Sequence, residues 1–360
     1  MLYVNGRFLT QPVSGVQRYA RELLGAFDAL LAARGEIAEV LVPHAVAVPA
    51  WRALRVRVVR GGHGHAWEQT SLAHAARHGR LVSLGNSGPL AHRDHVLCLH
   101  DANLFEIPQA FSPAYRAWHG FLRPRLARRA AHLLTVSRHS AQALGRHLRV
   151  DPARFTIVPN SAEHVLNWPV DAGAPARHGL EAGRYILSVG NQSPNKNLAA
   201  LVQAHALAGS EVPPLVLVGG AVPGVTDART AQDGRVRALG RVPDSDLRGL
   251  YEGAAGFVFP SLHEGFGIPP LEAMQLGVPV LCARAGAMPE VLGQAPMWFD
   301  PLDVRDMAQA LNEFARLRPD QLRALQVMGR AIASQYRWRD SATKLCDVLE
   351  NHAGVAPLAA

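Results

Sequence analysis

Short apolar runs alternate with segments of helical spacing along most of this chain. Turn residues bound the apolar runs, which lie at 96–99, 133–136, 186–189, 215–218 and 256–259. Residues 16–31 have helical spacing and follow Ser14-Gly15, and residues 137–148 begin with Ser137, a residue suited to cap a helix. Such alternation predicts parallel sheets with helices on both faces, an α/β doubly wound architecture.

The alternation lapses once, between residues 160 and 184. This stretch holds Trp168-Pro169 and a run of small turn residues from Asp171 to Pro175, after which strands and helices resume. We therefore predict two domains, 1–168 and 169–335. A chain of 360 residues, 48% of them hydrophobic, is long and apolar enough for two cores. Ligands of such sheets bind beyond the carboxyl ends of the strands.

Composition narrows the setting in which the protein works. The chain begins with no basic and apolar signal region, and no stretch approaches the roughly 18 to 20 apolar residues of a membrane-spanning helix. We expect a cytoplasmic protein. Cys98, Cys282 and Cys346 are odd in number and lack metal-like spacing, so we interpret them as core residues.

The net charge of +8 indicates an anionic partner. Nucleic acid, anionic lipid and anionic substrates all fit, and charge alone does not choose among them. One helical stretch combines aromatic and basic side chains, namely Trp118, Phe121, Arg123, Arg125, Arg128 and Arg129. It is either an ordinary solvated face or a face that docks on a membrane surface. Lys196 and Lys344 are the only lysines, so a retained lysine suggests a specific need.

A glycine-bearing loop follows the apolar run 256–259. Its sequence is His263-Glu264-Gly265-Phe266-Gly267-Ile268. Pro269 and Pro270 then favour a helix start, and Gly277 favours its end. The amides of a helix N-terminus bind phosphate oxygens, and glycine permits close approach of a ligand. Glu264 and Glu272 add acceptors for the hydroxyl groups of a sugar and a ribose. The segment therefore predicts a nucleotide-sugar site.

This segment resembles the E-x7-E signature of the family-4 retaining glycosyltransferases, and the resemblance runs over most of the chain. It implies the GT-B fold, in which two doubly wound Rossmann-like domains face each other across a cleft. Residues 1–168 would form the acceptor side, 169–335 would bind the donor nucleotide, and 336–352 would form a terminal helix that crosses back to the first domain. A turn with a capped helix and surface acids is the alternative interpretation of the motif alone.

The resemblance also assigns roles to residues. Glu264 and the amides of the following loop would contact the donor sugar, and the helix start at Ile268 would face phosphate. Glu272 would bind ribose hydroxyls. The loop residues concerned are Gly265, Phe266 and Gly267. Glu264 is also a candidate catalytic residue.

Three further segments resemble the family. Lys196, in Asn195-Lys196-Asn197, matches the lysine that holds the donor diphosphate, although Asn195 stands where the family usually has arginine. An ammonium there would stabilise the leaving group. Gly15 matches the loop that approaches the donor phosphate. His100 matches a histidine near the transferred sugar, with a purely structural histidine as the alternative. We take Lys196 and His100 as candidate catalytic residues.

The backbone around Val242 resembles the turn that reads the nucleobase. There is no persuasive Asp-x-Asp element for a divalent ion, so we predict no metal and no cofactor besides the nucleotide-sugar substrate. The resemblance implies a retaining hexosyltransferase of bacterial O-antigen or exopolysaccharide assembly, with a glycan or polyprenyl-diphosphate-linked acceptor and peripheral contact with an anionic membrane.

We favour GDP-mannose as donor, with UDP-glucose and dTDP-rhamnose as alternatives. Two other classes stay open: a nucleotide-sugar-binding protein without transfer activity, and a nucleic-acid-binding protein, which would show steeply salt-dependent affinity. We do not expect nucleic acid as a partner.

Overall fold

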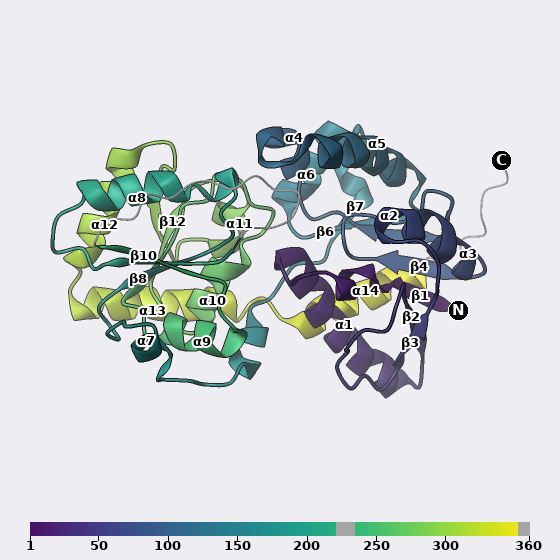
Figure 1. The fold of residues 1–360 in the computed structure, drawn as a ribbon, viewed down its shortest axis with the longest axis horizontal. Coiled ribbons are helices and arrows are strands. Elements are labelled where there is room, and N and C mark those ends of the chain that lie inside the picture. Colours follow the sequence, from purple (N-terminus) through teal and green to yellow (C-terminus); the bar gives the residue numbers. More distant parts are fainter. Residues whose placement is uncertain (221–234, 352–360) are drawn as a thin grey trace. The chain divides into compact units, whose positions relative to one another are not determined.

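The computed structural model describes residues 1–220 and 235–351, so residues 221–234 and 352 of the expected domains lie outside the described residues. The chain divides into two compact units. The first comprises Met1–Ala102, Ala117–Asn160 and Arg337–Ala360, and the second comprises Asn103–Arg116 and Ser161–Tyr336. In the described part, each unit contains one fully parallel sheet with helices packed around it (Figure 1). This is the predicted α/β architecture.

The sheet of the first unit has the strand order β3-β2-β1-β4-β5-β6-β7 in the described residues. The strands are β1 (Leu2–Asn5), β2 (Ala38–Val42), β3 (Leu54–Val58), β4 (Arg80–Ser83), β5 (His95–Cys98), β6 (His132–Thr135) and β7 (Phe155–Ile157). β5 and β6 each begin one residue before the predicted run, a usual uncertainty at strand ends. The edge strand β3 alternates Val and Arg and is largely exposed, whereas β5 is buried throughout.

Long helices cover this sheet. They and the shorter helical turns are η1 (Gly6–Thr10), α1 (Gly15–Arg34), α2 (Gly64–Trp67), the π-helical η2 (Glu68–Leu72), α3 (Ala73–Ala75), α5 (Pro113–Arg129), α6 (Arg138–Leu148), η4 (Pro152–Arg154) and α14 (Trp338–Asn351). α6 begins after Ser137, whose side chain accepts a hydrogen bond from the Ser140 amide, as predicted. α14 packs on α1, where the Trp338 ring meets the Tyr19 ring edge at 6.0 Å.

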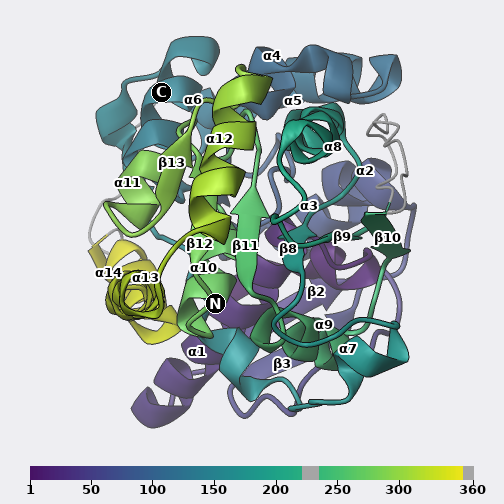
Figure 2. The ribbon, with the colours of Figure 1, turned by 90° about the vertical axis from the view of Figure 1, so that its left-hand side faces the viewer.

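The sheet of the second unit has the order β10-β9-β8-β11-β12-β13 in the described residues. The strands are β8 (Ile186–Val189), β9 (Leu215–Val218), β10 (Val236–Gly240), β11 (Gly256–Phe259), β12 (Val280–Ala283) and β13 (Met297–Phe299). Figure 2 shows them side by side. β8 and β11 pair in parallel, with Gly256 opposite Ile186 and Phe257 opposite Leu187. β8, β9 and β11 match their predicted runs at both ends.

Helices cover both faces of this second sheet. The helices and helical turns of the second unit are α4 (Asn103–Glu106), η3 (Pro108–Ala110), η5 (Glu163–Asn167), α7 (Ala174–Arg177), η6 (Pro194–Lys196), α8 (Leu198–Leu207), α9 (Asp244–Glu252), α10 (Ile268–Gln275), α11 (Met288–Leu292), α12 (Val304–Ala315) and α13 (Pro319–Ala333), and not all of them lie on the sheet. α8 and α12 form one layer, and α9, α10 and α13 form the other (Figure 1). Phe314 of α12 packs so closely on Gly256 that a Cβ there would lie 2.4 Å from the ring.

The compact units begin and end at other residues than the domains we expected. Residues 161–168 group with the second unit, because His164 of η5 bonds to Glu272 of α10 and the carbonyls of Leu166 and Trp168 accept from Arg248 of α9. Residues 103–116 group with the second unit as well. No described helix is long and apolar enough to cross a membrane.

Candidate functional site

The middle of the second sheet is a topological switch point. β8 and β11 are neighbours, but the chain leaves β8 toward β9 on one side and leaves β11 toward β12 on the other. In open α/β sheets this geometry opens a crevice at the carboxyl ends of the two strands, where ligands bind. Lys196 follows β8 and Glu264 follows β11. Two predicted site residues from segments 68 positions apart therefore reach the same point of the sheet.

Lys196 and Glu264 form an ion pair at this switch point. The Lys196 ammonium bonds to Oε1 of Glu264, and the two side chains keep 16% and 14% of their surface exposed. The ammonium also lies 5.2 Å from the centre of the Phe259 ring. The Leu262 amide donates to the Asn195 carbonyl at 2.8 Å, which joins the two loops. A cation and a carboxylate thus stand together within reach of solvent, able to meet a phosphate and a hydroxyl group.

The loop after Glu264 is shaped by its backbone. Gly267 is the N-cap residue of α10 and has φ +93°. A Cβ added at this position would lie 2.5 Å from the Met288 side chain, so only glycine fits. Pro269 and Pro270 have no N–H, so two of the donors at the start of α10 are missing. The donors that this helix start can offer a ligand are therefore the amides around Gly267 and Ile268.

Phe266 contributes its backbone and not its ring to the loop surface. The side chain is 4% exposed and meets the Tyr336 ring edge at 5.3 Å. The packing of this buried ring on Tyr336 fixes the position of the loop backbone. Among the candidate loop residues, Gly265 is also buried.

Glu272 of α10 is held by two buried side chains. Its Oε1 accepts from Nε2 of His164 at 2.7 Å, and its Oε2 accepts from the Tyr251 hydroxyl at 2.8 Å. Burial and the Glu272 charge raise the pKa of Tyr251 well above its usual value, so the hydroxyl keeps its proton. Neither partner is evident from the sequence around Glu272, since the two side chains come from η5 and α9.

The loop also depends on Gly286, which the sequence analysis missed. Gly286 has φ +57°, and a Cβ there would lie 2.8 Å from the backbone of Glu264. The Ala287 amide donates to the Glu264 carbonyl at 3.0 Å. The sequence does contain a signal for this position: a glycine that follows the apolar strand β12 closely, where a turn is expected.

The segment between β10 and α9 contains the predicted base-reading residue. Val242 is partly buried there, and the preceding Arg241 is exposed. Asp246 in the first turn of α9 bonds to Arg177 at 2.8 Å and to His178 at 3.0 Å. The described residues contain no group of three His, Cys, Asp or Glu side chains placed to hold a metal ion.

Gly15 and His100 belong to the first unit. Gly15 is the first residue of α1, and a Cβ there would meet no atom within 4 Å. Tyr19, one turn further along α1, places its ring edge-on to His100 at 4.7 Å. The start of α1 and the end of β5 thus lie close together. Packing within the described unit does not explain glycine at position 15.

His100 is held on several sides. Its Nε2 bonds to the Leu84 carbonyl at 2.8 Å, its amide bonds to Asn86, and its carbonyl accepts from Ser140 at 2.8 Å. Since a carbonyl only accepts, the proton lies on Nε2 and Nδ1 is left as an acceptor. Burial lowers the pKa of His100, which favours the neutral ring. The geometry suits a hydrogen-bond acceptor better than a proton donor.

The predicted basic face of α5 is smaller than expected. Arg123 is 2% exposed and points inward, because it lies about half a helical turn from Arg125 and Arg128. Phe121 and Arg125 are exposed, and the Arg125 guanidinium stacks 3.7 Å from the Phe121 ring centre. The exposed face therefore consists of Phe121, Arg125, Arg128 and Arg129.

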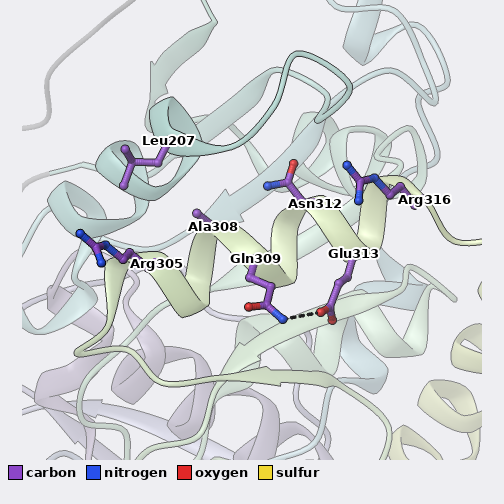
Figure 3. A pocket seen from close by; sticks show the side chains of 7 residues that line it. All are labelled: Leu207, Arg305, Ala308, Gln309, Asn312, Glu313 and Arg316. Atoms are coloured by element: carbon purple, nitrogen blue, oxygen red, sulfur yellow. Dashed lines mark hydrogen bonds between the residues drawn. The ribbon is translucent and has the colours of Figure 1, made fainter.

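A separate groove of about 500 Å³ lies between α8 and α12 (Figure 3). Among the residues that line it, Gln309 and Glu313 bond to each other at 2.8 Å, and Arg305 and Arg316 lie toward the two ends of α12. None of the predicted site residues lines it. The groove lies on the outer helical layer and does not include the Lys196–Glu264 pair, so we do not assign the proposed donor site to it.

Comparison with known proteins agrees with this geometry. Residues 183–316 match the family described as "Glycosyl transferases group 1". O-antigen chain mannosyltransferase B of Escherichia coli is 32% identical over 271 residues, which cover 69% of this chain and 68% of that protein. The chain belongs to the group 1 glycosyltransferases. MMP alpha-(1->4)-mannosyltransferase of Mycolicibacterium hassiacum is also 32% identical to this glycosyltransferase, over 66% of the chain and 59% of that protein.

A solved structure shares the fold of this glycosyltransferase. The Anabaena HepE protein in complex with UDP-glucose superposes with a TM-score of 0.72 at 19% identity, over 97% of this chain and 99% of that one. At this identity the likeness establishes the fold alone, which is the GT-B fold.

Proposed function

We propose that this glycosyltransferase moves a hexosyl group from a nucleotide-sugar, GDP-mannose by preference, to a glycan or polyprenyl-diphosphate-linked glycan in bacterial surface polysaccharide synthesis. The observation that carries the proposal is the Lys196–Glu264 pair at the switch point of the second sheet. The preference for mannose is supported by the names of the two mannosyltransferases to which the chain is similar.

In the proposed site, Glu264 and the amides of Gly265 to Gly267 bind the sugar, and Glu272 binds the ribose. Lys196 and the backbone at Ile268 bind the diphosphate. We also propose, from the family resemblance, that Gly15 approaches donor phosphate and that the backbone around Val242 reads the base. These roles agree with the chemistry of each group, because an ammonium attracts phosphate and carboxylates accept from hydroxyls.

We propose a transfer that retains the anomeric configuration. The departing diphosphate oxygen takes the proton of the acceptor hydroxyl on the same face of the sugar, while Lys196 stabilises the charge that grows on the leaving group. His100 would accept a hydrogen bond from a sugar hydroxyl through Nδ1. We further propose that no metal and no other cofactor takes part. The anomeric configuration of the product, measured by NMR, tests the stereochemistry.

The metal proposal has a simple test. Activity should survive EDTA, because Lys196 supplies the cation at the leaving group. Complete loss of transfer with EDTA, restored by one divalent ion, would refute metal independence.

A donor panel tests the sugar and the base. We expect GDP-mannose to raise the melting temperature more than UDP-glucose or dTDP-rhamnose does. Stabilisation by UDP-sugars alone would refute the mannose donor, and it would favour the glucosyl alternative, in line with the UDP-glucose bound to HepE. Donor binding without transfer or donor hydrolysis would indicate a non-catalytic nucleotide-sugar-binding protein.

We propose that the protein works in the cytoplasm at the inner membrane face. The exposed face of Phe121, Arg125, Arg128 and Arg129 supports contact with anionic lipid. Co-sedimentation with vesicles of phosphatidylglycerol, compared with phosphatidylcholine alone, tests this contact. Equal binding to both would refute it.

A further inference from the structure

The Glu272 carboxylate is fixed at both of its oxygens by groups that lie deeper in the second unit. The side chain of His164 is 1% exposed, Tyr251 is fully buried, and the Glu272 side chain keeps 7% of its surface. The two donors sit on η5 and α9, two elements that both precede α10 in the sequence. They act on Glu272 and are too deeply buried to meet a ligand themselves.

Two donors on one carboxylate determine its orientation. A carboxylate group rotates readily about its terminal bond, which has a broad torsional preference. A bond of 2.7 Å to Oε1 and one of 2.8 Å to Oε2 remove this freedom. A carboxylate offers about four acceptor positions, more than the bonds from His164 and Tyr251 take up by themselves. Such a preorganised acceptor discriminates sharply between ligands with and without the matching hydroxyls.

We infer that His164 and Tyr251 are positioning residues that make Glu272 selective for the paired 2′ and 3′ hydroxyls of a ribonucleotide. The inference rests on the proposed function, which assigns Glu272 to the ribose. Beyond that role, the selectivity comes from His164 and Tyr251. These two side chains do not touch the ligand, but they hold the Glu272 carboxylate in the orientation that a vicinal diol requires.

The test compares GDP and UDP with their 2′,3′-dideoxy counterparts by isothermal titration calorimetry. We expect the wild-type protein to bind the better ribonucleotide at least about tenfold more tightly than its dideoxy form. His164→Leu and Tyr251→Phe should lower this ratio by at least about threefold, with little change for the dideoxy form. His164→Gln, which retains a donor near the position of Nε2, should recover part of the ratio.

Matched controls exist in the same unit. His205 is buried and bonds to the Pro213 carbonyl at 2.8 Å, and Tyr185 bonds to the Leu250 carbonyl at 2.6 Å. His205→Leu and Tyr185→Phe remove equivalent buried groups without touching Glu272, so the ratio should stay at the wild-type value.

The outcomes separate the inference from the function on which it rests. A wild-type ratio that persists in His164→Leu and Tyr251→Phe would overturn the positioning role and leave the donor site intact. Equal loss of affinity for both forms would also overturn it, since it would indicate a structural role alone. No preference in the wild-type protein would refute the ribose role of Glu272, and binding of neither GDP nor UDP would refute the donor site itself.

Discussion

The two sheets have the same switch-point topology, but their switch points are filled differently. In the first unit β1 and β4 are neighbours, and Glu68 of η2 reaches the polar groups at their carboxyl ends. Its carboxylate is 1% exposed and bonds to four side chains, those of Asn5, Arg7, His65 and Ser87. In the second unit the Lys196–Glu264 pair occupies the equivalent place and remains partly exposed.

The comparison separates a structural carboxylate from one that we propose is functional. Glu68 is fully surrounded by donors, which lower its pKa to about 2 despite its burial. Its network joins η2 to the ends of the strands and belongs to the fold. Glu264 meets one cation at the surface of a glycine-bearing loop, so a ligand can replace that contact. Topology locates a site, but the side chains decide whether it is available.

The largest expected effect is on transfer by Glu264→Ala. We expect turnover to fall on the order of 10² to 10³-fold, because the variant removes a polar contact to the reacting sugar. The melting temperature should change little, since the side chain is partly exposed. Steady-state kinetics with the identified donor and calorimetry measure the two effects. Near-wild-type turnover would contradict the role of Glu264.

Lys196→Met comes next. Loss of the ammonium should lower kcat by roughly 10²-fold, because the charge on the leaving diphosphate is no longer stabilised. Lys344→Met is the matched control: Lys344 is exposed on α14, and the change removes the same charge. If both variants lowered kcat equally, general charge and not a specific contact would be responsible.

Glu68→Gln should affect stability and not chemistry. Its pKa of about 2 lies below the usual value of 4.5, so the charged form stabilises the fold above pH 4.5, and this contribution disappears as the pH falls toward 2. We expect a loss of about 3 kcal/mol at pH 7 and a much smaller difference near pH 2.

Denaturant unfolding at several pH values measures the effect of Glu68→Gln. The control is Glu39→Gln, which breaks the exposed pair with Arg57 and should cost less than about 1 kcal/mol. A pH-independent difference between wild type and Glu68→Gln would contradict the assignment of the low pKa.

The smallest effect is expected from Gly15→Ala. A methyl group there meets nothing within the described unit, so stability should be unchanged, but kcat/KM for the donor should fall by about tenfold if phosphate approaches this backbone. Gly25→Ala on the same helix also meets nothing within 4 Å and serves as control. Equal kinetics for the two variants would remove Gly15 from the site.

Local patterns predicted much of the fold. The strand 256–259, its loop and the helix before Gly277 were readable because apolar runs, glycines and prolines act through neighbouring residues. Lys196 and Glu264 were each predicted from their motifs, but their ion pair depends on strand order, which a single sequence does not encode locally. The contacts of His164 and Tyr251 with Glu272 depend on tertiary packing in the same way.

Arg123 is a different case. The four clustered arginines in the second half of α5 looked alike in composition, yet helical periodicity places Arg123 opposite Arg125 and Arg128. The direction in which each arginine points could have been read from its position along the helical repeat. A count of basic residues ignores that position. The unit boundary at Ser161 could not be predicted in that way, because the turn-rich stretch after it packs on α9 and α10 through individual side chains.

We propose that the Lys196–Glu264 pair opens to receive a nucleotide-sugar, with the carboxylate on the sugar and the ammonium on the diphosphate. Titration calorimetry of GDP and GDP-mannose against wild type and Glu264→Gln tests it most directly. We expect the variant to bind GDP-mannose more weakly than wild type does, and to bind GDP at least as tightly, because Lys196 is released from its partner. Equal loss of affinity for GDP and GDP-mannose, or no change in either, would contradict it.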